Sequence, residues 1–191
     1  MRMKTGLLSE DKVAQKSADI SKNGIIDTSG HTLREYLLTP LEDGDMDGYI
    51  LKEGRTEYML VIPETAGTLI QKAASEFNTF FHEATGRDLR IVTEADSSDK
   101  CISIGETSLL TETDITYDYS ELGSDGYKIV TRDDDIYLIG GSDYGSLYAV
   151  YELLAQLVEY DFFAEDCYTV AQNVKNIQFK DFNITDIRDF A

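Results

Sequence analysis

The sequence predicts an α/β (α+β) sandwich, in which a mixed β-sheet carries two main amphipathic helices. Two segments, about 66–84 and 143–160, place apolar residues at the three-and-four spacing of a helix with one buried face. Short β-rich runs come before, between and after these segments, and turn residues separate them. One-sided helices bury their apolar stripe against another layer, so hairpins mixed with two such helices indicate a sheet covered by helices.

The first half of the pattern runs from residue 48 to residue 86. Residues 48–52 (GYILK) and 56–62 (TEYMLVI) are β-rich and separated by EGR, which predicts a hairpin. Gly86 is placed to end the following helix in a left-handed conformation. The predicted buried stripe of this helix consists of Leu69, Ile70, Ala73, Ala74, Phe77, Phe80, Phe81 and Ala84.

The second half alternates strands with the second helix. Predicted strands are 89–93 (LRIVT), 101–105 (CISIG), 126–132 (GYKIVTR), 135–141 (DIYLIGG), 168–170 (YTV) and 176–182 (NIQFKDF). Asp133, Asp134 and Asp135 predict a solvated hairpin tip between two of these strands. The second helix has Leu147, Val150, Tyr151, Leu154 and Val158 on one face.

The length of the chain limits the number of domains, and its net charge limits the kinds of partner. The 191 residues suit one globular domain, which we expect at 48–191, preceded by a flexible or loosely structured acidic segment at 1–47. The formal net charge of −19 disfavours nucleic acid and anionic membranes as partners. No apolar run reaches the length of a membrane span, and the start of the chain has no hydrophobic signal region. Removal of an earlier signal peptide, and hence an extracytoplasmic location, stays open.

The two cysteines, Cys101 and Cys167, form no CxxC pair. Two buried free thiols are the expectation, with a disulfide as the alternative. A cysteine-based metal site is not predicted.

The glycines at 140–145 follow a strand and precede a helix, as in a phosphate-binding loop. Their pattern is G-G-x-x-x-G instead of G-x-G-x-x-G, and the strand before them belongs to a hairpin. We expect Asp143 at the N-cap of the helix, where its carboxylate repels phosphate. We therefore expect Gly140 and Gly141 to turn the chain and Gly145 to allow close helix–sheet packing. No cofactor is predicted.

An Asp-rich stretch before residue 48 resembles a calcium loop. Asp43, Asp45 and Asp47 stand at positions one, three and five of such a loop. A fainter copy begins 24 residues earlier at Asp19, but position twelve of both copies is glycine in place of the bidentate acid. The spacing thus leaves two interpretations, an acidic linker with turns, which is favoured, and a calcium site.

Candidate catalytic residues are not distinguished by the sequence. Hydrolysis by paired carboxylates needs two acids at a fixed separation, and among 36 acids some pair meets that distance by chance. We expect the acids at 133–135 and at Asp161, Glu165 and Asp166 on surface turns. His31 and His82 have no serine or cysteine partner in a motif, so no catalytic residue is predicted.

Four segments form an ordered set of motifs: EYMLVIPETAGTLIQKAASEFNTFFHEATGRDLRIVTEA, ISIGET, ELGSDGYKIVTRDDDIYLIGGSDYGSLYAVYELL and an exit segment, DFFAEDCYTVAQNVKNIQF. Through these motifs the chain resembles the N-terminal domain of alpha-glucuronidase-type glycoside hydrolases and their uncharacterised relatives, and a similar domain precedes the barrel of beta-hexosaminidases. The resemblance implies that the catalytic carboxylates lie on a TIM barrel that follows this domain.

Two departures from the family pattern concern candidate contact residues. Family members often carry Arg where this chain has Tyr144, and RWF where it has Asp161, Phe162 and Phe163. We regard Tyr144, Phe162 and Phe163 as interdomain or sugar contact candidates. Tyr117 and Tyr119, in the predicted loop DITYDYSEL, are further candidates for such contacts.

These observations favour a non-catalytic accessory domain of a carbohydrate-active enzyme, whose partners are a catalytic barrel of the same polypeptide and a carbohydrate. The alternative is a standalone module that binds a glycan or a protein, with or without calcium.

Overall fold

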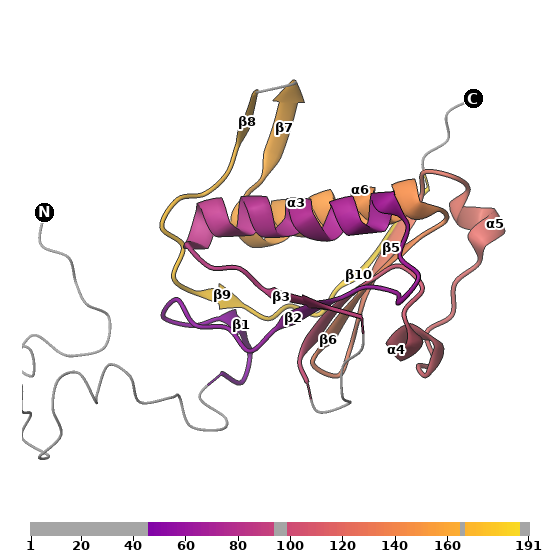
Figure 1. Cartoon of the computed structure of the whole chain (residues 1–191), viewed down its shortest axis with the longest axis horizontal. Helices are drawn as coiled ribbons and strands as arrows, with labels where there is room; N and C mark the ends of the chain where they lie inside the picture. The colour runs from indigo at the N-terminus through magenta and orange to yellow at the C-terminus, as the bar shows by residue number, and fades with distance from the viewer. Residues whose placement is uncertain (1–45, 94–98, 165–166, 188–191) are drawn as a thin grey trace, which may run out of the picture. The chain divides into compact units, whose positions relative to one another are not determined.

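A six-stranded mixed sheet forms the centre of the folded unit that starts at Gly48 (Figure 1). The computed structural model describes residues 46–93, 99–164 and 167–187. The strands in spatial order are β10 (Asn183–Asp186), β5 (Tyr127–Arg132), β6 (Asp135–Gly140), β4 (Cys101–Ile104), β2 (Met59–Val61) and β3 (Arg90–Val92). The four strands from β6 to β3 are parallel, while β5 and β10 are antiparallel to their neighbours. The predicted mixed sheet is confirmed.

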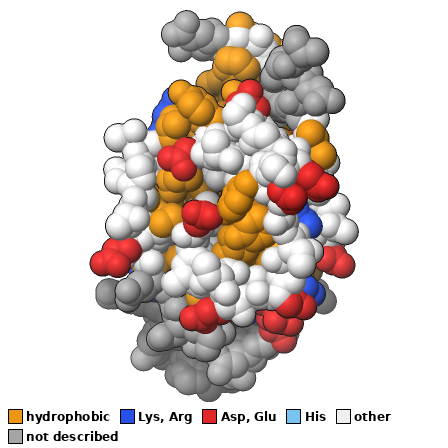
Figure 2. Space-filling view, turned by 90° about the vertical axis from the view of Figure 1, so that its right-hand side faces the viewer, with side chains coloured by type: hydrophobic (Ala, Val, Ile, Leu, Met, Phe, Trp, Pro, Cys, Tyr) orange, Lys and Arg blue, Asp and Glu red, His pale blue; other side chains and the backbone are white. Residues whose placement is uncertain are grey.

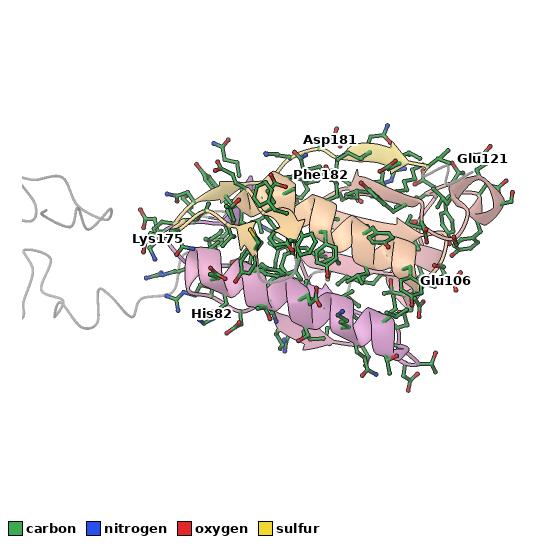
Figure 3. All side chains as sticks on the ribbon, turned by 90° about the horizontal axis from the view of Figure 1, so that it is seen from above. His82, Glu106, Glu121, Lys175, Asp181 and Phe182 are labelled. Atoms are coloured by element: carbon green, nitrogen blue, oxygen red, sulfur yellow. The ribbon has the colours of Figure 1, made fainter. Side chains whose placement is uncertain are left out.

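Two long helices, α3 (Thr68–Thr85) and α6 (Asp143–Val158), lie side by side on one face of this sheet (Figures 1 and 3). Their bounds are within two residues of the predicted ones. The α3 residues Ala73, Phe77 and Phe81 are 0–1% exposed, which confirms the stripe read from the three-and-four spacing. This core of one helical layer on one sheet is the predicted sandwich.

The ends of α3 follow from glycine chemistry. Gly86 has φ of 72°, and its backbone N–H donates to the carbonyl of His82 at 2.7 Å, so the predicted left-handed stop is confirmed. At the other end, Gly67 is the N-cap and supplies no side-chain hydrogen bond. The first-turn N–H groups of α3 are therefore not capped by a side chain.

Two short helices were not predicted: α4 (Ser108–Thr111) and α5 (Tyr119–Leu122). Each is one turn long, too short to show a hydrophobic period. Local hydrogen bonds define them: the Thr107 hydroxyl accepts from the Leu110 N–H, and the Asp118 carboxylate accepts from the Ser120 N–H. Leu110 and Leu122 are buried with Tyr137 and Ile139 of β6.

The predicted hairpin of residues 48–62 is wrong. β1 (Tyr49–Leu51) pairs antiparallel with β9 (Ile177–Gln178), far along the chain, while β2 lies between β4 and β3. The turn itself exists, because Lys52 and Arg55 form a bridge. All three residues of β2 are buried, as in a central parallel strand with both faces covered, and such a strand takes neighbours that are distant in sequence.

The strands of residues 161–186 differ from the prediction in number and bounds. β8 (Cys167–Thr169) is the predicted strand near 168–170, but its partner β7 (Asp161–Ala164) was not predicted. Of the predicted strand 176–182 only β9 (Ile177–Gln178) is a strand, and β10 begins after it, at Asn183. Every described residue of β7 and β8 is exposed, and the hairpin projects beyond the helical layer (Figure 1).

The expectation of two buried thiols is half right. Both cysteines are free, and Cys101 is buried, but Cys167 lies exposed on β8. The predicted disulfide alternative does not occur.

The predicted three-residue acidic tip is also corrected. Asp135 begins β6, and its carboxylate accepts a 2.7 Å hydrogen bond from the Cys101 N–H, so Asp133 and Asp134 alone form the turn. Burial raises the pKa of this carboxyl.

Among the residues that the structure describes, no helix is both long and apolar enough to cross a membrane.

Candidate functional site: a polar cleft and an aromatic surface

A cleft of about 590 Å³ opens at the edge where the parallel strands β2, β4 and β6 end. Its walls are the segments that directly follow these strands, including Gly105, Glu106 and Gly141, together with the first turns of α3 and α6. From β2 the chain continues to β3 on one side of β2, and it then returns to β4 on the other side. The cleft therefore lies where the order of the strands changes direction. Ligand sites of open α/β sheets lie at such a change of direction.

Figure 2 shows the face of the molecule at this end, with acidic side chains spread around hydrophobic patches. Figure 3 places Glu106 at the end of the helical layer opposite to His82 and Lys175. Among the described residues that line the cleft, none is Lys or Arg.

Glu106 and Tyr119 form the outer wall of the cleft. The Tyr119 hydroxyl donates a hydrogen bond to the Glu106 carboxylate. Burial raises the pKa of Tyr119, and this bond raises it further, so the hydroxyl stays a donor. The rings of Tyr117 and Tyr119 meet edge to face at 5.0 Å. The sequence-predicted pair is thus brought together, with Tyr119 at the cleft.

Asp143 and Ser142 form the inner wall at the start of α6. The N-cap is Ser142, whose hydroxyl accepts from the Tyr144 N–H at 3.1 Å, so the predicted N-cap Asp143 is wrong by one residue. Asp143 is the first helical residue, and a Cβ built on Gly67 would lie 3.1 Å from its Oδ2. One carboxylate therefore lies near the positive ends of both α6 and α3.

Ser146 lies deeper in the cleft and is 3% exposed. No hydrogen bond joins its hydroxyl to any residue that the structure describes. A buried hydroxyl normally finds a partner, so this one is available to a bound molecule.

The glycines beside the cleft serve packing. A Cβ on Gly145 would lie 2.3 Å from the carbonyl oxygen of Gly126, and one on Gly141 would lie 1.8 Å from that of Gly123. Both contacts are with backbone, which cannot move aside as a flexible side chain can. The close packing predicted for Gly145 is confirmed, and Gly141 likewise meets backbone closely.

A second candidate region is an aromatic surface on the helical layer and the β7–β8 hairpin. We define the aromatic surface by the exposed or half-buried residues Tyr144, Tyr148, Tyr151, Phe162, Phe163 and Tyr168; the buried ring of Tyr160 contacts those of Tyr151 and Tyr168. Ring contacts tie it to α3, since the Phe80 ring lies 4.4 Å from that of Tyr160 and 5.1 Å from that of Tyr168. A groove of about 460 Å³ runs between Tyr148, Tyr151 and Phe162.

The sequence-predicted contact residues Tyr144, Phe162 and Phe163 are exposed here by 53%, 59% and 62%. Their roles remain predictions. Sequence reasoning missed Glu106 and Ser146 as cleft residues and Tyr148 as a surface residue. A polar residue after a strand and a tyrosine on a helix occur equally often where no ligand or partner binds, so the sequence did not single them out. The one available signal was the position of Glu106 directly after a buried strand and a glycine.

Of the three weak calcium candidates, two lie outside the described residues. Asp43 and Asp45 lie outside the described residues, and Asp47 is exposed. Within the part of the chain that the structure describes, no three His, Cys, Asp or Glu side chains gather to hold a metal ion. The calcium hypothesis stays a prediction.

The model of the glycosyl hydrolase family 67 N-terminus matches residues 52–153, from the turn after β1 to the middle of α6. The chain belongs to this family. The glycosyl hydrolase family 67 N-terminus match covers α3, the parallel strands and the start of α6, and so includes every segment that lines the cleft. None of the curated proteins matches the chain.

A solved structure shows the same fold within a larger enzyme. The chain is similar to a family GH115 4-O-methyl-alpha-glucuronidase, BtGH115A, with specificity for decorated arabinogalactans, at a TM-score of 0.54 and 11% identity over 73% of this chain and 18% of that one. It is also similar to the GH20 beta-N-acetylhexosaminidase from Streptomyces coelicolor A3(2), at a TM-score of 0.44 and 12% identity over 68% of this chain and 22% of that one. The chain thus spans about a fifth of the length of these enzymes.

Proposed function

We propose that this family 67 N-terminal domain is a non-catalytic accessory domain of a carbohydrate-active enzyme, and that it packs against a catalytic barrel of the same polypeptide through the aromatic surface. Family membership and the small share of the GH115 alpha-glucuronidase that the chain spans support an accessory role.

The observation that carries the proposal is the exposure of the β7–β8 hairpin. Phe162, Phe163 and Tyr168 expose 59%, 62% and 39% of their surface. Tyr168 contacts the Phe80 and Tyr160 rings, but Phe162 and Phe163 stay mostly exposed, so a partner that covers them would stabilise this two-stranded hairpin. Clustered exposed aromatic rings are typical of protein interfaces.

The groove between Tyr148, Tyr151 and Phe162 fits this role, because anchors of interfaces fill such pockets. Glu152 and Asp161 also line the groove, so an anchor with an apolar stem and a cationic head, such as Arg, suits it.

The test is to express the chain with the residues that follow Ala191 in its natural reading frame. Amide hydrogen exchange of β7 and β8 is then compared with that of the 191-residue chain. We expect strong protection in the longer protein only. Phe162→Ser with Phe163→Ser should weaken the protection, whereas Ile91→Ser, at a residue 42% exposed on the far edge strand β3, should not.

An unprotected hairpin in the longer protein would refute the packing proposal. A reading frame that ends at Ala191 would favour the alternative, a standalone glycan- or protein-binding module, which the polar cleft independently supports.

A further inference from the structure

The cleft at the carboxyl ends of β2, β4 and β6 offers both acceptors and donors to a ligand. The carboxylates of Glu106 and Asp143 accept hydrogen bonds, and one carboxylate has room for several. The first-turn N–H groups of α3, which no side chain caps, donate them. The buried Ser146 hydroxyl can do either.

Charge narrows the ligand class. The carboxylates of Glu106 and Asp143 line the cleft, and none of its described lining residues is cationic. Phosphate, sulfate and carboxylate ligands are therefore repelled. A metal ion lacks a ligand cluster in the described part of the chain, and it would face the positive ends of α3 and α6. A neutral molecule avoids both penalties.

Shape narrows it further. The cleft volume of about 590 Å³ falls within the usual range of small-molecule sites. The Tyr119 ring, 38% exposed, supplies an apolar wall, and Ile70 and Ile139 supply another inside. The cleft therefore has apolar walls as well as the polar groups of Glu106, Asp143 and Ser146. A ligand with apolar C–H faces and a rim of hydroxyl groups can contact both.

We propose that this cleft is a binding site for a neutral sugar, one or two pyranose rings in size. Glu106 and Asp143 accept hydrogen bonds from the sugar hydroxyls, Ser146 and the α3 amides bind its oxygens, and Tyr119 packs on a C–H face. The site requires no partner domain, so it does not depend on the proposed interdomain role.

The experiment is a titration of the purified ¹⁵N-labelled chain followed by amide chemical shifts. The probes are D-xylose, D-galactose and L-arabinose as neutral sugars, D-glucuronate as an anion and ethanolammonium as a cation. We expect saturable shifts with at least one neutral sugar, at Gly105, Glu106, Gly141 and Ser142, and weaker binding of both charged probes.

Matched variants distinguish binding in the cleft from nonspecific binding to exposed surface. Asp143→Asn and Ser146→Ala should each weaken binding about tenfold, as expected for a lost hydrogen bond in a buried site. Ser75→Ala, at an exposed serine of α3 outside the cleft, should leave it unchanged. The unliganded spectra report whether each variant is folded, and the wild-type shift map tests the site without any variant.

Three outcomes would overturn the proposal. They are no saturable shift with any neutral sugar, shifts confined to the aromatic surface, and tighter binding of D-glucuronate or ethanolammonium than of every neutral sugar.

Discussion

Gly145 shows how one residue sets the distance between two layers. It lies in the first turn of α6, and a Cβ there would come within 2.3 Å of the Gly126 carbonyl oxygen and 3.0 Å of the Gly140 Cα. The helix start, the end of β6 and the start of β5 therefore meet backbone to backbone, with no room for a side chain.

Gly145→Ala should destabilise the chain by about 1–3 kcal/mol, the usual cost of overpacking, despite the better helix propensity of alanine. Urea denaturation measures this loss. Gln156→Ala, at an exposed position of the same helix, is the control and should change the midpoint little. Equal midpoints for both variants would contradict the close contact.

Cys101 and its neighbours make the folded chain sensitive to alkali. Burial and the nearby Asp135 carboxylate raise the pKa of the Cys101 thiol from 9.0 to about 12. Burial likewise raises the pKa of Tyr137 from 10.0 to about 12, with a further contribution from Asp135. Because each folded pKa lies above the unfolded value, the folded state holds these protons more strongly.

The free energy of unfolding should therefore be fully retained below about pH 9 and decline toward pH 12, by at most about 1.4 kcal/mol per pH unit for each group. Urea denaturation across this range measures the slope. Cys101→Ala should make it shallower. Val61→Ala, which removes packing from the same buried cluster without a titrating group, should lower stability and keep the slope. The same slope in the cysteine variant would contradict the assignment.

At the scale of elements, α6 connects the core to both candidate regions. Its buried face includes Leu147, Val150 and Leu154, exposed by 6%, 0% and 0%, which confirms their predicted burial. Its first turn borders the cleft, and its tyrosines form part of the aromatic surface. Packing of one helix thus fixes the position of both.

Leu154→Ala should cost about 2–5 kcal/mol, the range for a buried leucine truncation. A shift of the thermal or urea midpoint measures the loss. Ala155→Ser, at the adjacent half-buried position, is a milder comparison and should cost less. An unchanged midpoint for the leucine variant would mean that this face is not the core.

The folded unit that starts at Gly48 is an acidic α/β domain with a polar cleft, which two carboxylates, those of Glu106 and Asp143, line. Glu106 accepts the Tyr119 hydroxyl, and Asp143 lies against the start of α3. A glycosidase instead needs two carboxylates held on either side of the scissile bond, one of them with a raised pKa.

The purified chain should accordingly release no product from 4-nitrophenyl glycosides or glucuronoxylan fragments, even at high protein concentration. Turnover that survives repurification and is lost in Glu106→Gln or Asp143→Asn would contradict the accessory role and assign catalysis to the cleft.

The sequence by itself determined the two helices, the Gly86 stop, the mixed sheet and the packing role of Gly145. These features rest on local signals, namely apolar spacing and glycine chemistry, which the chain carries wherever it folds. The resemblance of its motifs to the alpha-glucuronidase N-terminal domain likewise pointed to the family that the match over 52–153 shows.

Only the tertiary structure decided the partners of β1 and β2, the half-buried position of Asp135, the exposure of Cys167 and the meeting of Glu106, Asp143 and Ser146. Strand pairing is a choice among distant segments, and a buried apolar run such as Met59–Val61 does not encode its neighbours. The cleft has the same origin: its side chains come from loops after separate strands, and they meet because parallel strands end at one edge of the sheet.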